Sequence, residues 1–82
     1  MVQGFINAYY RTRDHGFITG QDGSSYFFKL MGVSYGKLRD RLLALPQLDW
    51  GAPVEGTVEF ANGGKTIPHA KYPEAKNVRL VA

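Results

Sequence analysis

Apolar and polar residues alternate regularly between residues 54 and 60. Every second residue from Val54 to Phe60 is apolar or glycine, and the residues between them are Glu, Thr and Glu. Because successive side chains of a strand point to opposite faces, this pattern predicts a β-strand with one buried face. Residues 2–10, 15–19 and 26–30 are rich in the aromatic and β-branched residues that favour strands, and residues 75–81 predict a closing strand.

The segments that separate these strands are typical of turns and loops. Residues 11–14 are basic and polar, and Asp22-Gly23 is a dipeptide that suits a tight hairpin. Short strands joined by turns favour an antiparallel meander over a parallel sheet with crossover helices. Residues 61–74 contain Gly63-Gly64 and Pro73, and they predict a long loop before the last strand.

One segment departs from the β pattern. Its apolar residues recur at helical spacing with basic residues between them: Leu38, Leu42 and Leu45, with Arg39 and Arg41. This spacing predicts a helix over residues 34–45, with Ser34 as the N-cap and Pro46 just beyond the end. A helix this short is only marginally stable in water by itself, so we expect its leucine face to pack on one end of the barrel.

The predicted order is three strands, one helix and two strands. A chain of 82 residues has room for a single domain, residues 1–82, with one core. Five short strands predict an all-β fold, a five-stranded OB-fold barrel with a helix inserted between strands three and four. A small core leaves little room for a large cavity, so binding is expected on the surface. The aromatic residues expected in the core are Tyr26, Phe28, Trp50 and Phe60.

The ordered segments resemble the cold-shock domain family. Members of that family read G-x-V-K-W-F-N-x-x-K-G-F-G-F-I, then a turn, then V-F-V-H-F. Here Gly16-Phe17-Ile18 matches the end of the first motif, and Tyr26-Phe27-Phe28-Lys29-Leu30 stands in the place of the second. Val58-Glu59-Phe60 and Ala75-Lys76-Asn77-Val78 resemble the family's later V-x-F and A-x-N-V. The resemblance covers both ends of the chain in the right order, and it implies a cold-shock-like barrel that binds single-stranded RNA or DNA.

The resemblance also implies a binding face. In the family, the positions matching Tyr9, His15, Phe17, Phe27 and Lys29 line the nucleic-acid face, and we expect Arg11 and Arg13 to add phosphate contacts. Strand parity independently pairs His15 with Phe17, and Phe27 with Lys29. Exposed rings stack on unpaired bases, and basic groups attract phosphates. The alternative is that the rings pair across strands or fill the core, and Tyr9 and His15 fit either interpretation.

The sequence departs from the family at several of these positions. Ala8 replaces a surface Trp, His15 and Leu30 replace Phe, and Lys29 replaces His. The stacking platform is therefore smaller and its rim more basic, which predicts stronger salt dependence. The whole chain has ten Lys and Arg against seven Asp and Glu, a net charge of +3, which is compatible with a polyanionic partner.

Catalytic and metal motifs are not supported by the sequence. The chain has no cysteine, which excludes disulfides and thiolate chemistry. Gly64-Lys65-Thr66 resembles the end of a phosphate-binding loop, but Glu59 stands where that motif requires glycine. The Ser34 to Lys37 segment matches a serine–lysine nucleophile pattern by letter alone. His15 and His69 have no partner at ligand spacing. We expect no enzyme activity, cofactor or metal.

Two functions are compatible with this sequence. The first is a module that binds single strands and acts in the regulation of transcription or translation; the sequence leaves RNA and DNA open. The second is a regulatory module that binds a protein, such as transcription machinery, through the Leu38–Leu45 helix with Arg39 and Arg41. Arg39 and Arg41 are expected to be exposed on the outer face of the helix, and that face could serve either partner. The chain shows no signal peptide or membrane-spanning apolar run, so a cytoplasmic location without membrane contact is expected.

Overall fold

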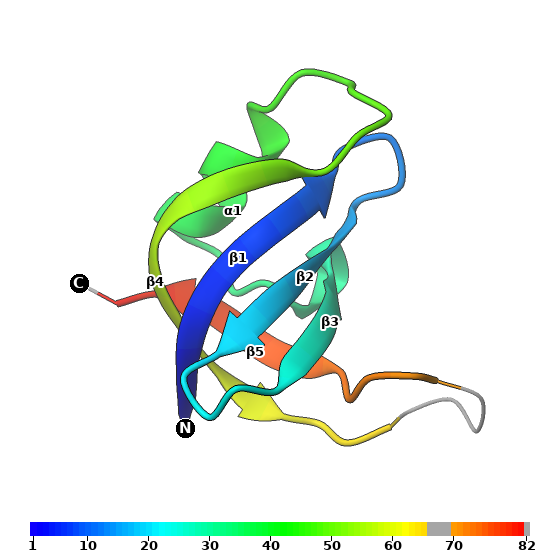
Figure 1. Ribbon diagram of the computed structural model, residues 1–82. Coiled ribbons are helices and arrows are strands. Elements are labelled where there is room, and N and C mark those ends of the chain that lie inside the picture. Colours follow the sequence, from blue (N-terminus) through cyan, green and yellow to red (C-terminus); the bar gives the residue numbers. More distant parts are fainter. Residues whose placement is uncertain (66–69, 82) are drawn as a thin grey trace.

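Five antiparallel strands form one sheet that curls into a half-barrel (Figure 1). This computed structural model describes residues 1–65 and 70–81. The strands are β1 (Val2–Tyr10), β2 (His15–Gly20), β3 (Ser25–Lys29), β4 (Ala52–Asn62) and β5 (Ala75–Leu80). They lie in the order β3-β2-β1-β4-β5. The predicted set of five strands and the mainly β architecture are confirmed.

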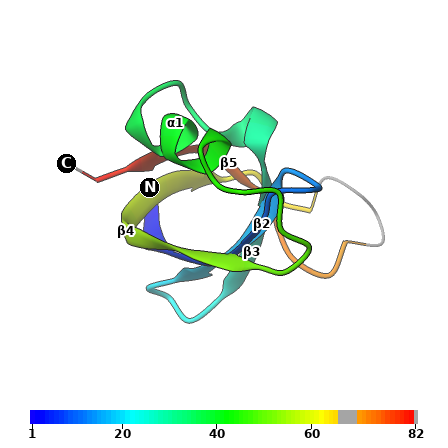
Figure 2. The ribbon, with the colours of Figure 1, turned by 90° about the horizontal axis from the view of Figure 1, so that it is seen from above.

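The two edge strands of the sheet approach each other. Phe27 of β3 forms a parallel bridge with Glu74, and its backbone N–H donates to the Pro73 carbonyl at 3.0 Å. A second parallel bridge joins Val33 to Val78 of β5. These contacts bring the edges together, so one face of the sheet is the interior and the other faces outward. Seen from above, the strands surround a common interior (Figure 2).

Side chains from all five strands and from the helix fill that interior. The buried core consists of Ile6, Tyr9, Ile18, Tyr26, Phe28, Val33, Leu38, Leu42, Val54, Val58, Phe60, Ala75 and Val78. The rings of Tyr26 and Phe60 meet edge to face with centroids 4.8 Å apart. The prediction of core positions is confirmed for Tyr26, Phe28 and Phe60. It is wrong for Trp50, which is 58% exposed, because this residue precedes β4 and no strand alternation directs it inward.

A β-bulge interrupts β1 and changes which side chains face inward. Ile6 pairs with Ile18, but Ala8 pairs with Phe17, so one extra residue of β1 stands opposite β2. A bulge of this kind reverses the alternation of the residues that follow it. Ile6 before the bulge and Tyr9 after it are therefore both buried.

β4 contains a second irregularity. Its pairing with β1 jumps from Thr57 to Val54, which leaves residues 55–56 outside the regular register. Gly56 adopts a φ of 106°, a left-handed conformation that glycine tolerates and side-chain-bearing residues avoid. The regular alternation predicted Gly56 on the buried face with Val54, but the irregularity exposes it.

The helix is shorter than predicted. The α1 helix spans Lys37–Leu43 rather than residues 34–45, and its N-cap is Gly36, at φ 147°. Ser34 is not a cap, because its backbone N–H donates to the Val78 carbonyl at 3.0 Å and holds the segment beside β5. A short 3₁₀ turn, η1 (Leu30–Gly32), connects this segment to β3.

The predicted docking face of α1 is confirmed. Leu38 and Leu42 are fully buried, and Leu45 packs against the same core. Figure 2 shows α1 lying beside β5, where it covers part of the interior. Since seven residues form a helix that is unstable alone, this leucine contact is what maintains α1.

We expect Leu42→Ala to lower the free energy of unfolding by about 2–5 kcal/mol, because truncation leaves a cavity in the core. Leu43→Ala is the matched control: the next leucine is 43% exposed, so its truncation should cost less than about 1 kcal/mol. Urea denaturation followed by circular dichroism measures both values. If the two variants lose equal amounts of unfolding free energy, the placement of α1 is contradicted.

Candidate nucleic-acid interface

The outer face of β2 and β3 carries four of the residues that the sequence indicated. Phe17 pairs directly with Phe27 across the two strands, and His15 pairs with Lys29. All four side chains point away from the core, because their neighbours in both strands are buried. The expected juxtaposition of these aromatic and basic side chains is confirmed.

Two tyrosines enlarge this block. The Tyr10 ring lies 5.8 Å from His15 and 6.4 Å from Phe17, centroid to centroid. The Tyr72 ring, from the segment before β5, meets Phe17 edge to face at 6.1 Å. We call this set the aromatic face, and its members are Tyr10, His15, Phe17, Phe27, Lys29 and Tyr72.

Neither tyrosine was predicted from the sequence. Tyr10 faces outward only because the bulge in β1 shifts the alternation. Tyr72 lies in the loop before β5, where no periodic pattern indicates a direction. The only available signal was the aromatic residue type next to basic residues.

Three shallow hollows follow one another along the aromatic face. The first, about 230 Å³, is lined by Asn7, Ala8, Phe17, Ser25 and Tyr72. The second, about 310 Å³, is lined mainly by Phe17, Phe27 and Tyr72. The third, about 340 Å³, includes Arg13, His15, Phe27 and Lys29. Because each hollow shares a ring with the next, they form a continuous surface that suits an extended ligand.

Basic groups border the rings. The Lys29 ammonium lies 5.9 Å from the centroid of the Phe27 ring, and the Lys71 ammonium lies 5.5 Å from that of Tyr72. Arg13 is exposed in the turn between β1 and β2 and lines the same hollow as Lys29. Cations held beside flat rings can meet phosphates while the rings meet bases.

Tyr9 does not belong to the aromatic face, so the prediction of a binding role for it is corrected. Its side chain is 1% exposed, and its ring packs against Phe28 with centroids 5.6 Å apart. Its hydroxyl donates to the Asp14 carboxylate at 3.4 Å. Burial, reinforced by the nearby Asp14 charge, raises the pKa of the Tyr9 hydroxyl well above its usual range.

Arg11 is also placed differently from the prediction. Its guanidinium pairs with the Asp14 carboxylate at 2.6 Å, its side chain is 17% exposed, and it donates to the Leu43 carbonyl at 3.5 Å. These contacts join the β1–β2 turn to the end of α1. The expectation that Arg11 lies free for phosphates is therefore wrong, because the ion pair and the helix already hold its guanidinium.

The described residues offer neither a metal site nor a membrane-spanning helix. Within residues 1–65 and 70–81, no cluster of three His, Cys, Asp or Glu residues could hold a metal ion. In the same part of the chain, no helix has the length and apolar character needed to cross a membrane. His69 lies outside the described residues.

A comparison with models of known protein families gives no match, and a comparison with curated protein sequences gives none either.

The raised pKa of Tyr9 predicts a loss of stability in alkali. The unfolded chain ionises its tyrosines near pH 10, whereas the folded state keeps the Tyr9 hydroxyl protonated to a higher pH. Its contribution to stability is therefore fully present below about pH 10 and declines as the pH rises further. Tyr9→Phe removes this hydroxyl, so its free energy of unfolding should decline less steeply above about pH 10. Urea titrations across this pH range measure the difference, and identical slopes would contradict the buried hydroxyl.

Proposed function

We propose that this protein is an OB-fold domain of the cold-shock type that binds single-stranded RNA or DNA on the aromatic face. The observation that carries the proposal is the direct pairing of Phe17 with Phe27 on the outer side of the sheet, bordered by Tyr72 and Lys29. A protein that keeps strands unpaired is suited to the regulation of transcription or translation.

The strand order supports the OB-fold part of the proposal. In this sheet β1 pairs with both β2 and β4, and Phe27 of the edge strand β3 is bridged in parallel to Glu74, the residue just before the other edge strand, β5. The helix α1 lies between β3 and β4 in the chain. OB-folds are partly open five-stranded barrels that bind oligonucleotides on strands two and three and on the adjoining loops. Arg13 and Tyr72 lie in the corresponding loops, between β1 and β2 and between β4 and β5.

The chemistry of the face favours unpaired strands. Every base has a flat π-face, but a duplex hides those faces inside its own stack. Phe17 and Phe27 are partly exposed, and the small side chain of Ala8 leaves a hollow beside Phe17 and Tyr72. A flat base could enter this hollow, which lies at the position where the cold-shock family carries a ring. Stacking on two or three rings with phosphates near Arg13 and Lys29 would then hold a short strand.

Removal of single rings tests the proposal. We expect Phe17→Ala, Phe27→Ala and Tyr72→Ala each to weaken binding of a fluorescein-labelled oligo(U) or oligo(dT) by about 1–3 kcal/mol, because each loses one stacking surface. Fluorescence anisotropy measures the affinity, and circular dichroism checks the fold.

Tyr35→Ala is the matched control for this experiment. Its ring is 90% exposed and lies next to α1, away from the aromatic face, so binding should not change. The proposal fails if folded variants of the aromatic face bind as tightly as the unsubstituted protein.

The salt dependence gives a second test. Three cations, Arg13, Lys29 and Lys71, border the aromatic face. Neutralisation of about three phosphates of a single strand predicts a slope of roughly −2 for log K against log salt concentration. Lys29→Gln should reduce the magnitude of this slope by about 0.7, because one phosphate contact is lost. Binding to a duplex of equal length should be weaker. Equal affinity for duplex and single strand would argue against stacking.

A further inference from the structure

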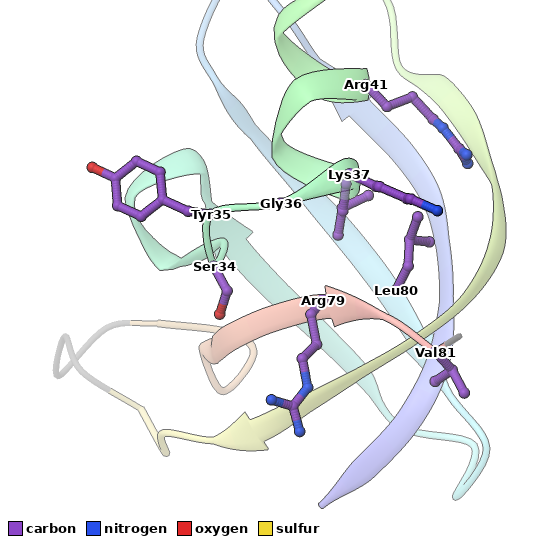
Figure 3. Close-up of a pocket in the computed structure, with 9 residues that line it drawn as sticks. Ser34, Tyr35, Gly36, Lys37, Arg41, Arg79, Leu80 and Val81 are labelled. Carbon is purple, nitrogen blue, oxygen red and sulfur yellow. The ribbon is translucent and has the colours of Figure 1, made fainter.

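A second concave surface lies between α1 and the end of β5, outside the aromatic face (Figure 3). Its volume is about 450 Å³. It is bordered by three cations and by an aliphatic floor, and we call it the basic pocket: Lys37, Arg41 and Arg79, with Leu38, Leu80 and Val81. Figure 3 shows Leu80 between Lys37 on one side and Arg79 and Val81 on the other. None of these residues belongs to the aromatic face, so the two surfaces are separate.

The positive charge of the basic pocket is only partly balanced. Lys37 is exposed and forms no ion pair within residues 1–65 and 70–81. The Arg41 guanidinium donates to the backbone carbonyl of Glu55 at 3.0 Å, which orients it, and it forms no ion pair with another described residue. Of the three cations, Arg79 is the one that forms an ion pair with another described residue, Glu59, at 2.6 Å. Two cations are thus available to an acidic ligand.

The backbone of β5 is open at the same place. The Val81 N–H donates to the Thr57 carbonyl of β4 at 2.9 Å, whereas the Val78 carbonyl accepts from Ser34 on the opposite side. Because alternate residues of a strand direct their backbone groups to the same side, Leu80 presents its N–H and C=O to the edge away from β4. The chain leaves this edge after Ser34, and no described backbone group bonds to Leu80 there.

We propose that the basic pocket binds an extended acidic peptide of a protein partner, which lies along β5 at Leu80. One apolar side chain would sit on the aliphatic floor, and flanking carboxylates would meet Lys37 and Arg41. An extended peptide that adds to a sheet edge gains main-chain hydrogen bonds and uses side-chain pockets for specificity. This proposal does not depend on nucleic-acid binding by the aromatic face.

The lining favours a peptide over a nucleic acid. The floor is aliphatic. Tyr35 is the one aromatic residue in the lining; its ring points away from Leu80 in Figure 3 and has the Arg39 guanidinium 4.7 Å from its centroid. Arg39 also donates to the Leu30 carbonyl at 3.2 Å. The expectation that Arg39 and Arg41 together form an exposed basic face is therefore corrected: Arg39 is half-buried and engaged, and Lys37 accompanies Arg41 instead.

The test uses the whole chain labelled with ¹⁵N and three unlabelled probes. The probes are a capped peptide that alternates Asp and Leu, the same peptide with Asn in place of Asp, and oligo(dT). We expect the acidic peptide to shift the amide signals of Lys37, Leu80 and Val81 and the Asn peptide to leave them unchanged. Oligo(dT) should leave these three signals in place.

Charge variants complete the test. Lys37→Gln and Arg41→Gln should each weaken binding of the acidic peptide by about two- to fivefold, and the control Lys65→Gln, in the β4–β5 loop, should not. Equal binding of the Asn peptide, or equal effects of all three variants, would overturn the proposal. If oligo(dT) shifts the amide signals of Lys37 and Leu80, the pocket binds nucleic acid, and the proposal is also overturned. These readouts are separate from the aromatic face, so either proposal can fail alone.

Discussion

Side-chain alternation across a curled sheet is the constraint on which this structure depends. Ile18, Tyr26 and Phe28 must point inward, because they supply the buried surface that stabilises a small domain. Their neighbours Phe17 and Phe27 must then point outward, and the register of β2 and β3 sets them side by side. A slip of one residue would bury these two rings and expose the core, so the core and the aromatic face cannot vary independently.

Regular strands could be predicted from the sequence, and irregular ones could not. Phe17 and Phe27 were placed correctly because β2 and β3 alternate without interruption. Tyr9 was placed wrongly because the bulge in β1 appears only when the strand is paired with β2, and a single strand's pattern does not contain that pairing. Trp50 and Tyr72 lie outside the strands, where the direction of a side chain depends on tertiary contacts rather than on periodicity.

The helix shows the same division between local and long-range information. Its leucine spacing correctly predicted burial of Leu38 and Leu42, since packing on the core follows from amphipathicity. Its beginning was predicted wrongly because Ser34 bonds to β5 instead of capping the helix. The basic pocket was also beyond the sequence, because it arises where β5 brings Arg79 close to Lys37 and Arg41 of α1. The two proposed surfaces lie on different elements, which would let the chain hold a single strand and an acidic partner together.

Contact between rings and bases tests most directly whether the outer side of β1, β2 and β3 binds unpaired bases by stacking. Isotope-filtered NOE spectra of the labelled protein with an unlabelled oligo(U) of about eight nucleotides would detect such contact. We expect NOEs from base protons to the ring protons of Phe17, Phe27 and Tyr72, and none to the buried Tyr9. A bound oligonucleotide that shows no NOE to these three rings, or shows NOEs only to Tyr35, would contradict stacking on the aromatic face.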